Sequence, residues 1–82
     1  MAEIKFGTIE GRRFIAIKCW RCDGYDIIFY PIRYSICDNC NALIKLNDEE
    51  LRKINEYLKD SGNTDSGDLL IRLRKKVLKS LA

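Results

Sequence analysis

Cys19-Trp20-Arg21-Cys22 and Cys37-Asp38-Asn39-Cys40 are the two stretches that decide the fold of this 82-residue chain. Each is a C-x2-C pair, and fourteen residues separate the two pairs. Two residues between cysteines allow both sulfurs of one turn to reach the same ion, and two such turns supply four soft donors in a tetrahedron. The spacing therefore predicts one structural site for a single Zn²⁺ ion, with four ligands: Cys19, Cys22, Cys37 and Cys40.

Other chemistry uses the same residues. Iron held by four thiolates has the same geometry, and a dithiol redox pair or disulfides also require paired cysteines. Residues 1–6 have neither the basic start nor the apolar run of a secretory signal, and no segment reaches the length of a membrane span. We therefore expect a cytoplasmic protein without membrane contact, where metal binding is favoured over disulfides. Iron and redox chemistry stay as alternatives to zinc.

The short length of the chain gives the metal a structural purpose. Eighty-two residues form one compact domain at most, and the apolar core of such a domain is marginally stable by itself. Structural zinc sites contribute about 10–16 kcal/mol of apparent binding free energy, which is comparable to the whole stability of a small domain. Loss of one ligand is therefore expected to unfold the β part.

Residues 4–46 have the composition of short strands joined by tight turns, rich in Ile, Phe and Tyr and interrupted by Gly and Pro. We expect a first hairpin from strands over 4–9 and 13–19. A second hairpin from strands over 25–30 and 33–37, bent at Pro31, and a last strand over 42–46 are expected to follow. Asp23-Gly24 and Asn41 come directly after the cysteine pairs and tolerate the left-handed backbone that a loop around a metal needs.

This arrangement of strands and cysteine turns over about residues 13–46 resembles the zinc ribbon, a family of small β modules in which two loops clamp one zinc ion. Asp23 and Asn41 stand where glycine is common in that family. The resemblance implies a role in transcription, translation or replication, where many such modules work. The expected fold is α+β, a small antiparallel β zinc ribbon over 1–46 followed by two C-terminal helices over 47–82, packed as one compact domain.

The helical part begins at Asn47, where Glu50 three residues on is typical of a capping box. We expect a helix over about 47–59, a polar loop over 60–67 and an amphipathic helix over about 68–81. The second helix has an apolar arc broader than one small sheet needs, which predicts contact with another element or with another chain, as in a homodimer. The predicted interface residues are Leu70, Leu73, Val77 and Leu81.

Two surfaces are candidates for partner binding. Trp20 and Arg21, in the middle of the first pair, are expected to point outward, where they can stack on a base or anchor a protein interface. The alternative is that Trp20 folds back over the core. The second helix carries a basic face that can contact phosphates or acids, or can simply keep the protein in solution. That face consists of Arg72, Lys75, Lys76 and Lys79.

The charge distribution restricts the nucleic-acid interpretation to local surfaces. The formal net charge is +3, and residues 68–82 hold five basic residues against one acidic residue. Four thiolates and one Zn²⁺ reduce the total to about +1.

The leading hypothesis is a small zinc-binding regulatory protein that binds nucleic acid or a protein of the transcription machinery. The alternative is an adaptor or inhibitor that docks or dimerises through its C-terminal helix. An enzyme is not expected, because the chain has no histidine and four thiolates leave no open metal position.

Overall fold

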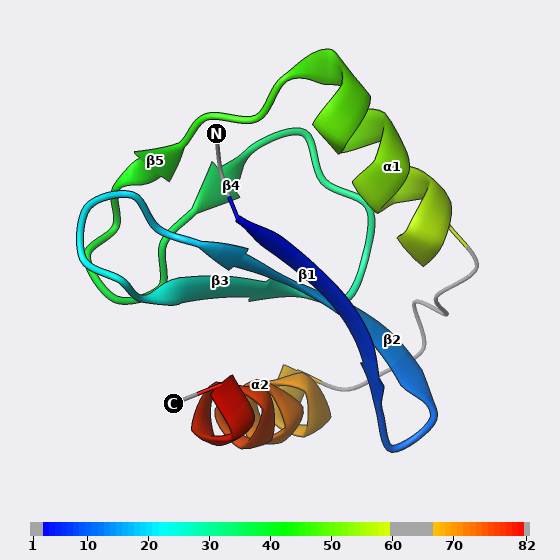
Figure 1. The fold of residues 1–82 in the computed structure, drawn as a ribbon. Helices are drawn as coiled ribbons and strands as arrows, with labels where there is room; N and C mark the ends of the chain where they lie inside the picture. Colours follow the sequence, from blue (N-terminus) through cyan, green and yellow to red (C-terminus); the bar gives the residue numbers. More distant parts are fainter. Residues whose placement is uncertain (1–2, 60–66, 82) are drawn as a thin grey trace.

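The computed structural model describes residues 3–59 and 67–81, so the predicted loop over 60–67 lies outside the described residues except for Gly67. The fold is α+β, with short strands in the N-terminal part and two helices after them (Figure 1). The strands are β1 (Ile4–Ile9), β2 (Arg12–Lys18), β3 (Tyr25–Ile28), β4 (Ser35–Ile36) and β5 (Leu43–Ile44). The helices are α1 (Asp48–Leu58) and α2 (Gly67–Leu81).

The first three strands form one antiparallel sheet in the order β1-β2-β3. The β1–β2 hairpin turns at Glu10 and Gly11, whose φ angles are 49° and 80°. Two left-handed residues in succession give the hairpin turn whose twist matches that of the flanking strands. The predicted first hairpin is therefore confirmed.

The predicted second hairpin is wrong, because β3 pairs with β2 and β4 pairs with β5 in a separate two-stranded sheet. The segment between β3 and β4 is held by helix α1 instead. The Ile32 backbone N–H donates to Asn55 Oδ1 at 2.9 Å, and Asn55 Nδ2 donates to the Ile32 carbonyl at 3.0 Å. These two bonds, together with Pro31, prevent the segment from folding back onto β3.

The three-stranded sheet is covered on both faces (Figure 1). Ile15 and Ile17 of β2 face one cluster, which contains residues of α1 and of the cysteine loops. Ala16 lies between them in sequence and faces a second cluster, which contains residues of α2. Residues 14–17 are therefore all apolar. They lack the alternation of apolar and polar residues seen in a strand with one solvent-exposed face, because successive side chains pack against different layers.

Helix α1 starts as the sequence predicts. Asn47 Oδ1 accepts from the Glu50 backbone N–H at 2.7 Å, and Glu50 Oε1 accepts from the Asn47 N–H at 3.0 Å, which is a complete capping box. Ile54 and Leu58 on its inner face are fully buried. Their burial fixes α1 over the same side of the sheet as the cysteines.

Candidate metal centre

The first cysteine loop, residues 19–24, follows β2 and closes on itself. The Cys19 N–H donates to the Gly24 carbonyl at 2.8 Å. Inside the loop, two backbone N–H groups point at sulfur: Arg21 N–H at Cys19 Sγ (3.3 Å) and Gly24 N–H at Cys22 Sγ (3.4 Å). Asp23 has φ 62°, which turns the chain back. Such donors stabilise the negative thiolate that binds a metal.

The second cysteine loop, residues 37–42, repeats this geometry between β4 and β5. The Cys37 N–H donates to the Ala42 carbonyl at 3.0 Å, and the Asn39 N–H points at Cys37 Sγ at 3.3 Å. Asn41 has φ 62°, the same as Asp23 in the first loop. The prediction that Asp23 and Asn41 take left-handed backbone is confirmed, and asparagine or aspartate performs this turn without glycine.

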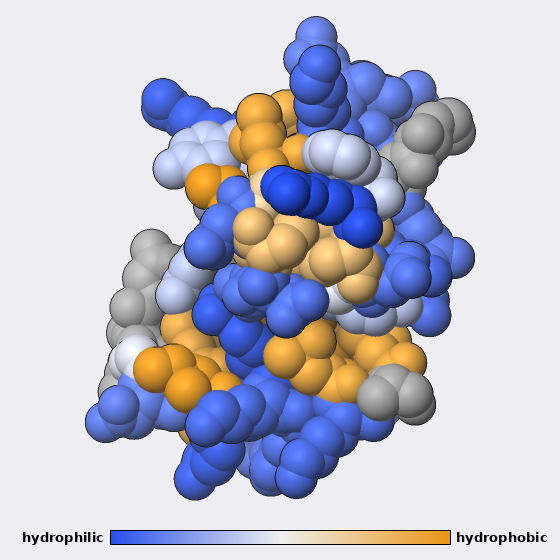
Figure 2. Space-filling view, turned by 90° about the vertical axis from the view of Figure 1, so that its left-hand side faces the viewer, coloured by the Kyte–Doolittle hydropathy of each residue, from blue (hydrophilic) through white to orange (hydrophobic). Residues whose placement is uncertain are grey.

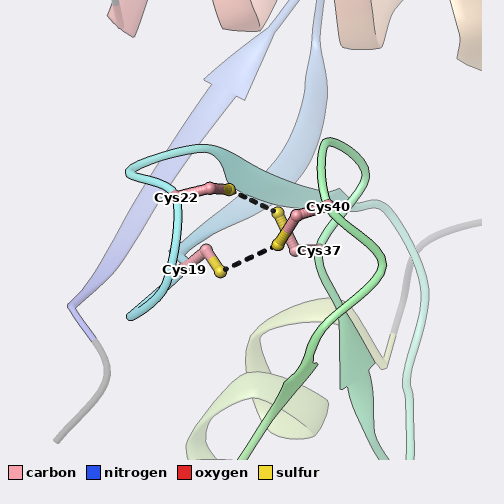
Figure 3. A group of neighbouring side chains, drawn as sticks. All are labelled: Cys19, Cys22, Cys37 and Cys40. Atoms are coloured by element: carbon pink, nitrogen blue, oxygen red, sulfur yellow. Dashed lines mark hydrogen bonds between the residues drawn. The ribbon is translucent and has the colours of Figure 1, made fainter.

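The two loops bring the four sulfurs together (Figure 3). All four lie within 4.8 Å of one another, with 3.7 Å between Cys19 Sγ and Cys40 Sγ and 3.4 Å between Cys22 Sγ and Cys37 Sγ. A tetrahedral ion with metal–sulfur bonds of about 2.3 Å requires sulfur–sulfur distances of about 3.8 Å. The cluster therefore fits one four-coordinate metal ion, as the cysteine spacing predicts.

The protonation of the thiols is set by their neighbours. A hydrogen bond from the Asn39 side chain, followed by one from the Gly24 backbone, lowers the pKa of Cys22 to about 6. A bond with the Ala42 backbone acts in the same direction on Cys40, but burial and the adjacent thiols together raise its pKa to about 12. Burial is the largest cause of the raised pKa of Cys37. Four adjacent thiols thus do not all ionise by themselves, whereas a bound cation favours the deprotonated form of each.

A polar cluster lies beside the second loop. Asp26 is buried and accepts a hydrogen bond from the Ser35 hydroxyl at 2.6 Å, and burial is the main cause of its raised pKa. Asp38 in the loop pairs with Arg74 of α2, with 3.3 Å between Oδ2 and Nε. This pair explains why an arginine interrupts the apolar arc of α2, since Arg74 reaches the metal loop.

Trp20 does not fold back over the core. Its side chain is 70% exposed, and its indole N–H donates to the Leu43 carbonyl at 3.0 Å. Arg21 next to it is also exposed. The first loop therefore presents both side chains to solvent, with the orientation of Trp20 fixed by its bond to β5.

The four basic residues predicted to bind a partner on the second helix are exposed on α2. Lys76 is engaged within the chain, because its ammonium lies 2.6 Å from Glu10 Oε2 in the β1–β2 turn. This bond is the main cause of the lowered pKa of Glu10. Helix α2 covers the sheet face opposite the cysteine cluster, so these residues and Trp20 belong to different layers.

The interface with another chain predicted for α2 requires a correction, whereas the alternative, contact with another element of the same chain, is confirmed. Leu70, Leu73 and Val77 are buried against the sheet of the same chain, where they meet Ala16, Ile27 and Phe29. Leu81 is partly buried against the same cluster. The broad apolar arc thus serves the second face of the sheet, and these three side chains are not available to another chain.

Sequence reasoning missed two exposed aliphatic side chains near Trp20, Ile36 and Leu43. Tyr34, Ile36 and Leu43 are 64%, 41% and 53% exposed, whereas Ser35 and Ile44 are buried. The available signal was the alternation of inward and outward side chains along the two strands beside the cysteines. Ser35 and Ile44 pair across the β4–β5 hairpin and share its inner face, so their neighbours along each strand face outward.

Comparison with known proteins leaves the function to be argued from this geometry. No family model, no curated protein and no solved structure matches the chain. Within residues 3–59 and 67–81, neither helix has the length and apolar character needed to cross a membrane.

Proposed function

We propose that this protein is a small zinc-binding regulatory protein of the zinc-ribbon type, which binds nucleic acid or a protein of the transcription machinery and is not an enzyme. Four thiolate donors at tetrahedral spacing support zinc as the ion. Four thiolates also fill the coordination sphere, which leaves no position for a reacting water. The metal then holds the two loops together, and function belongs to what the loops carry.

The observation that carries the proposal is the exposure of Trp20 at the tip of the first loop. A tryptophan that is 70% exposed leaves a large apolar surface in water, and its hydrogen bond to Leu43 holds the ring in one orientation. A fixed, exposed aromatic ring next to the cation of Arg21 suits stacking on a base or anchoring a protein contact.

A second candidate function is a protein-binding adaptor or inhibitor. Ile36 and Leu43 are directly opposite each other in the β4–β5 hairpin, and both are exposed. Exposed aliphatic side chains favour a protein partner, because nucleic acids are bound mainly by cations and aromatic rings. This surface replaces the apolar arc of α2 as the site for such a contact.

A pull-down from native host lysate, with and without nuclease, tests the choice between these partners. Nucleic-acid binding predicts partners that vanish with nuclease and an affinity that falls steeply with salt. Replacing Arg72, Lys75 and Lys79 by glutamine should reduce the slope of log affinity against log salt by about 2–3, since each phosphate contact contributes about 0.7–0.9. Lys76→Gln is the control, because Lys76 already pairs with Glu10 and should change the slope less.

Flat salt dependence together with no nuclease-sensitive partner would exclude nucleic acid. Emission spectrometry of the purified protein identifies the metal, and a coloured, iron-containing protein would contradict zinc.

A further inference from the structure

Arg74 is a cation on the inner side of helix α2. It follows the buried Leu70 by four residues and precedes the buried Val77 by three, so it lies on the side of α2 that packs against the sheet. Its side chain is 38% exposed, but its Nε atom is buried. Burial of part of a charged group costs free energy unless an opposite charge compensates it. The one acid of α2, Asp68, is six positions away, so the compensation has to come from another element.

The compensating charge belongs to Asp38, in the second cysteine loop. Asp38 Oδ2 lies 3.3 Å from Arg74 Nε. Within residues 3–59 and 67–81 this nitrogen makes no hydrogen bond, so the ion pair with Asp38 is what offsets its burial. The Asp38 side chain is itself 36% exposed, and a pair that is partly withdrawn from water is screened less by salt than a fully exposed pair.

The ion pair joins two layers of the molecule. Helix α2 covers the sheet face opposite the cysteine cluster, whereas Asp38 lies next to a member of that cluster. Figure 2 looks onto the end of the molecule where the cysteine loops lie above α2, and hydrophilic side chains there separate the apolar groups of the two levels. Polar contacts thus connect α2 to the metal loop at this end.

Asp38 occupies a position in the loop that affects a metal ligand directly. It follows the ligand Cys37 and precedes Asn39, whose backbone N–H donates to Cys37 Sγ at 3.3 Å. A shift of Asp38 therefore moves both a ligand sulfur and the donor that stabilises its thiolate form. Residues that orient metal ligands in this way typically change metal affinity by about 10- to 100-fold when they are replaced.

The electrostatics of the site also favour a cation at position 74. Metal loading adds negative charge, because the thiols release protons, and four thiolates with one Zn²⁺ carry a charge of about −2. Burial is the largest cause of the raised pKa of Asp26. Among its charged neighbours, Asp38 raises this pKa further and Arg74 lowers it. The guanidinium of Arg74 is thus close enough to act on both carboxylates, and it reduces their repulsion with the loaded centre.

We propose that Arg74 is a positioning residue of the metal centre, which couples helix α2 to the second cysteine loop. It holds Asp38 so that Cys37 and Asn39 keep their metal-binding geometry. The coupling is reciprocal, because a loop fixed by the metal also holds Arg74, and with it α2, against the second face of the sheet. This inference goes beyond the proposed function and does not depend on which partner the protein binds.

The first test measures the zinc affinity of the full chain by competition with a chromophoric chelator. Arg74→Met keeps an unbranched side chain but removes the charge, and it should lower the affinity at least about tenfold. Arg72→Met makes the same change at an exposed position of α2 and is the matched control, which should bind zinc as the wild type does. In an Asp38→Asn background, Arg74→Met should change the affinity by less than about twofold, because both residues act through one contact.

The second test measures amide hydrogen exchange in zinc-loaded Asp38→Asn. This substitution is in the metal loop, yet the amides of residues 70–77 in α2 should exchange at least about fivefold faster than in the wild type, because the helix opens more often. The amides of Ile54 and Leu58 in α1 are the internal control and should keep their wild-type rates. A role of Asp38 confined to its own loop would leave α2 unchanged.

Wild-type zinc affinity in Arg74→Met overturns the proposal. An equal loss in Arg72→Met overturns it in favour of an effect of net charge. A full effect of Arg74→Met in the Asp38→Asn background shows that Arg74 does not act through Asp38 and also overturns it. If Arg74→Met does not fold, the exchange rates of α2 in Asp38→Asn decide alone, and unchanged rates overturn the coupling. None of these outcomes bears on the proposed function, because neither test involves a partner.

Discussion

Replacing Gly24 by alanine should weaken metal binding, because the two cysteine loops touch at this residue. A Cβ at position 24 would lie 2.9 Å from Asn39 Cβ, 3.2 Å from Cys22 Sγ and 3.4 Å from Cys37 Sγ. Carbon atoms pack best at about 3.5 Å or more, so the loops must separate by about 0.6 Å. Metal sites tolerate ligand displacements of only about 0.2 Å.

The cost of this separation follows from the same distances. Inserting a methyl group into a packed site costs about 1–3 kcal/mol, which corresponds to metal affinity about 5- to 150-fold lower. The Asn39 side chain would be displaced, and the backbone N–H of the same residue donates to Cys37 Sγ. The strain therefore acts directly on a metal ligand.

The measurement is competition for Zn²⁺ against a chromophoric chelator. Gly67→Ala is the matched control, because a Cβ there meets no atom within 4 Å. Its affinity should equal that of the wild type. If Gly24→Ala binds Zn²⁺ as tightly as the wild type, the inference that the loops approach through this glycine is refuted.

Three other substitutions test the fold around the metal. Asn55→Ala removes both bonds to the Ile32 backbone and should cost about 1–3 kcal/mol in urea denaturation, whereas a cost near zero would contradict its role as a clamp. Cys37→Ser should lose the metal and the β-strand circular dichroism together, and a folded variant with stoichiometric metal would contradict a structural site. Asp26→Asn should be more stable than the wild type near neutral pH, with the difference shrinking as the pH falls. The reason is that the raised pKa of Asp26 makes its ionised form unfavourable in the folded state, and this penalty disappears once the carboxyl is protonated. A variant less stable than the wild type at neutral pH would show that the bond from Ser35 and the charge of Arg74 outweigh burial.

The metal cluster was predictable from the sequence because its determinants are local. C-x2-C spacing brings two sulfurs into one turn, and Asp23 and Asn41 supply the left-handed backbone within one residue of each pair. The first hairpin and the capping box at Asn47 are local in the same sense. In each case the interacting residues lie within a few positions of one another.

The features that sequence reasoning missed depend on distant contacts. The pairing of β4 with β5 instead of β3 follows in part from Asn55, which is 23 positions from its partner Ile32. The apolar arc of α2 packs within the chain because the three-stranded sheet has a second buried face. One signal for that face was present, since the apolar run 14–17 has no polar residue to turn toward solvent.

Burial of the α2 arc moves the search for a partner to the metal loops. Elsewhere in the described chain, Phe6 is exposed but stacks edge-on against Tyr57 at 5.1 Å, which gives it a structural contact. Trp20, Ile36 and Leu43 are exposed beside the cysteine cluster, and both cysteine loops hold them in place through β5 and through the bond from Trp20 to the Leu43 carbonyl. Metal removal should therefore abolish folding and partner binding together, whereas Leu43→Glu, at an exposed position, should weaken partner binding while the chain stays folded. A protein that still binds its partner after complete chelation would contradict this link between the metal and the surface it supports.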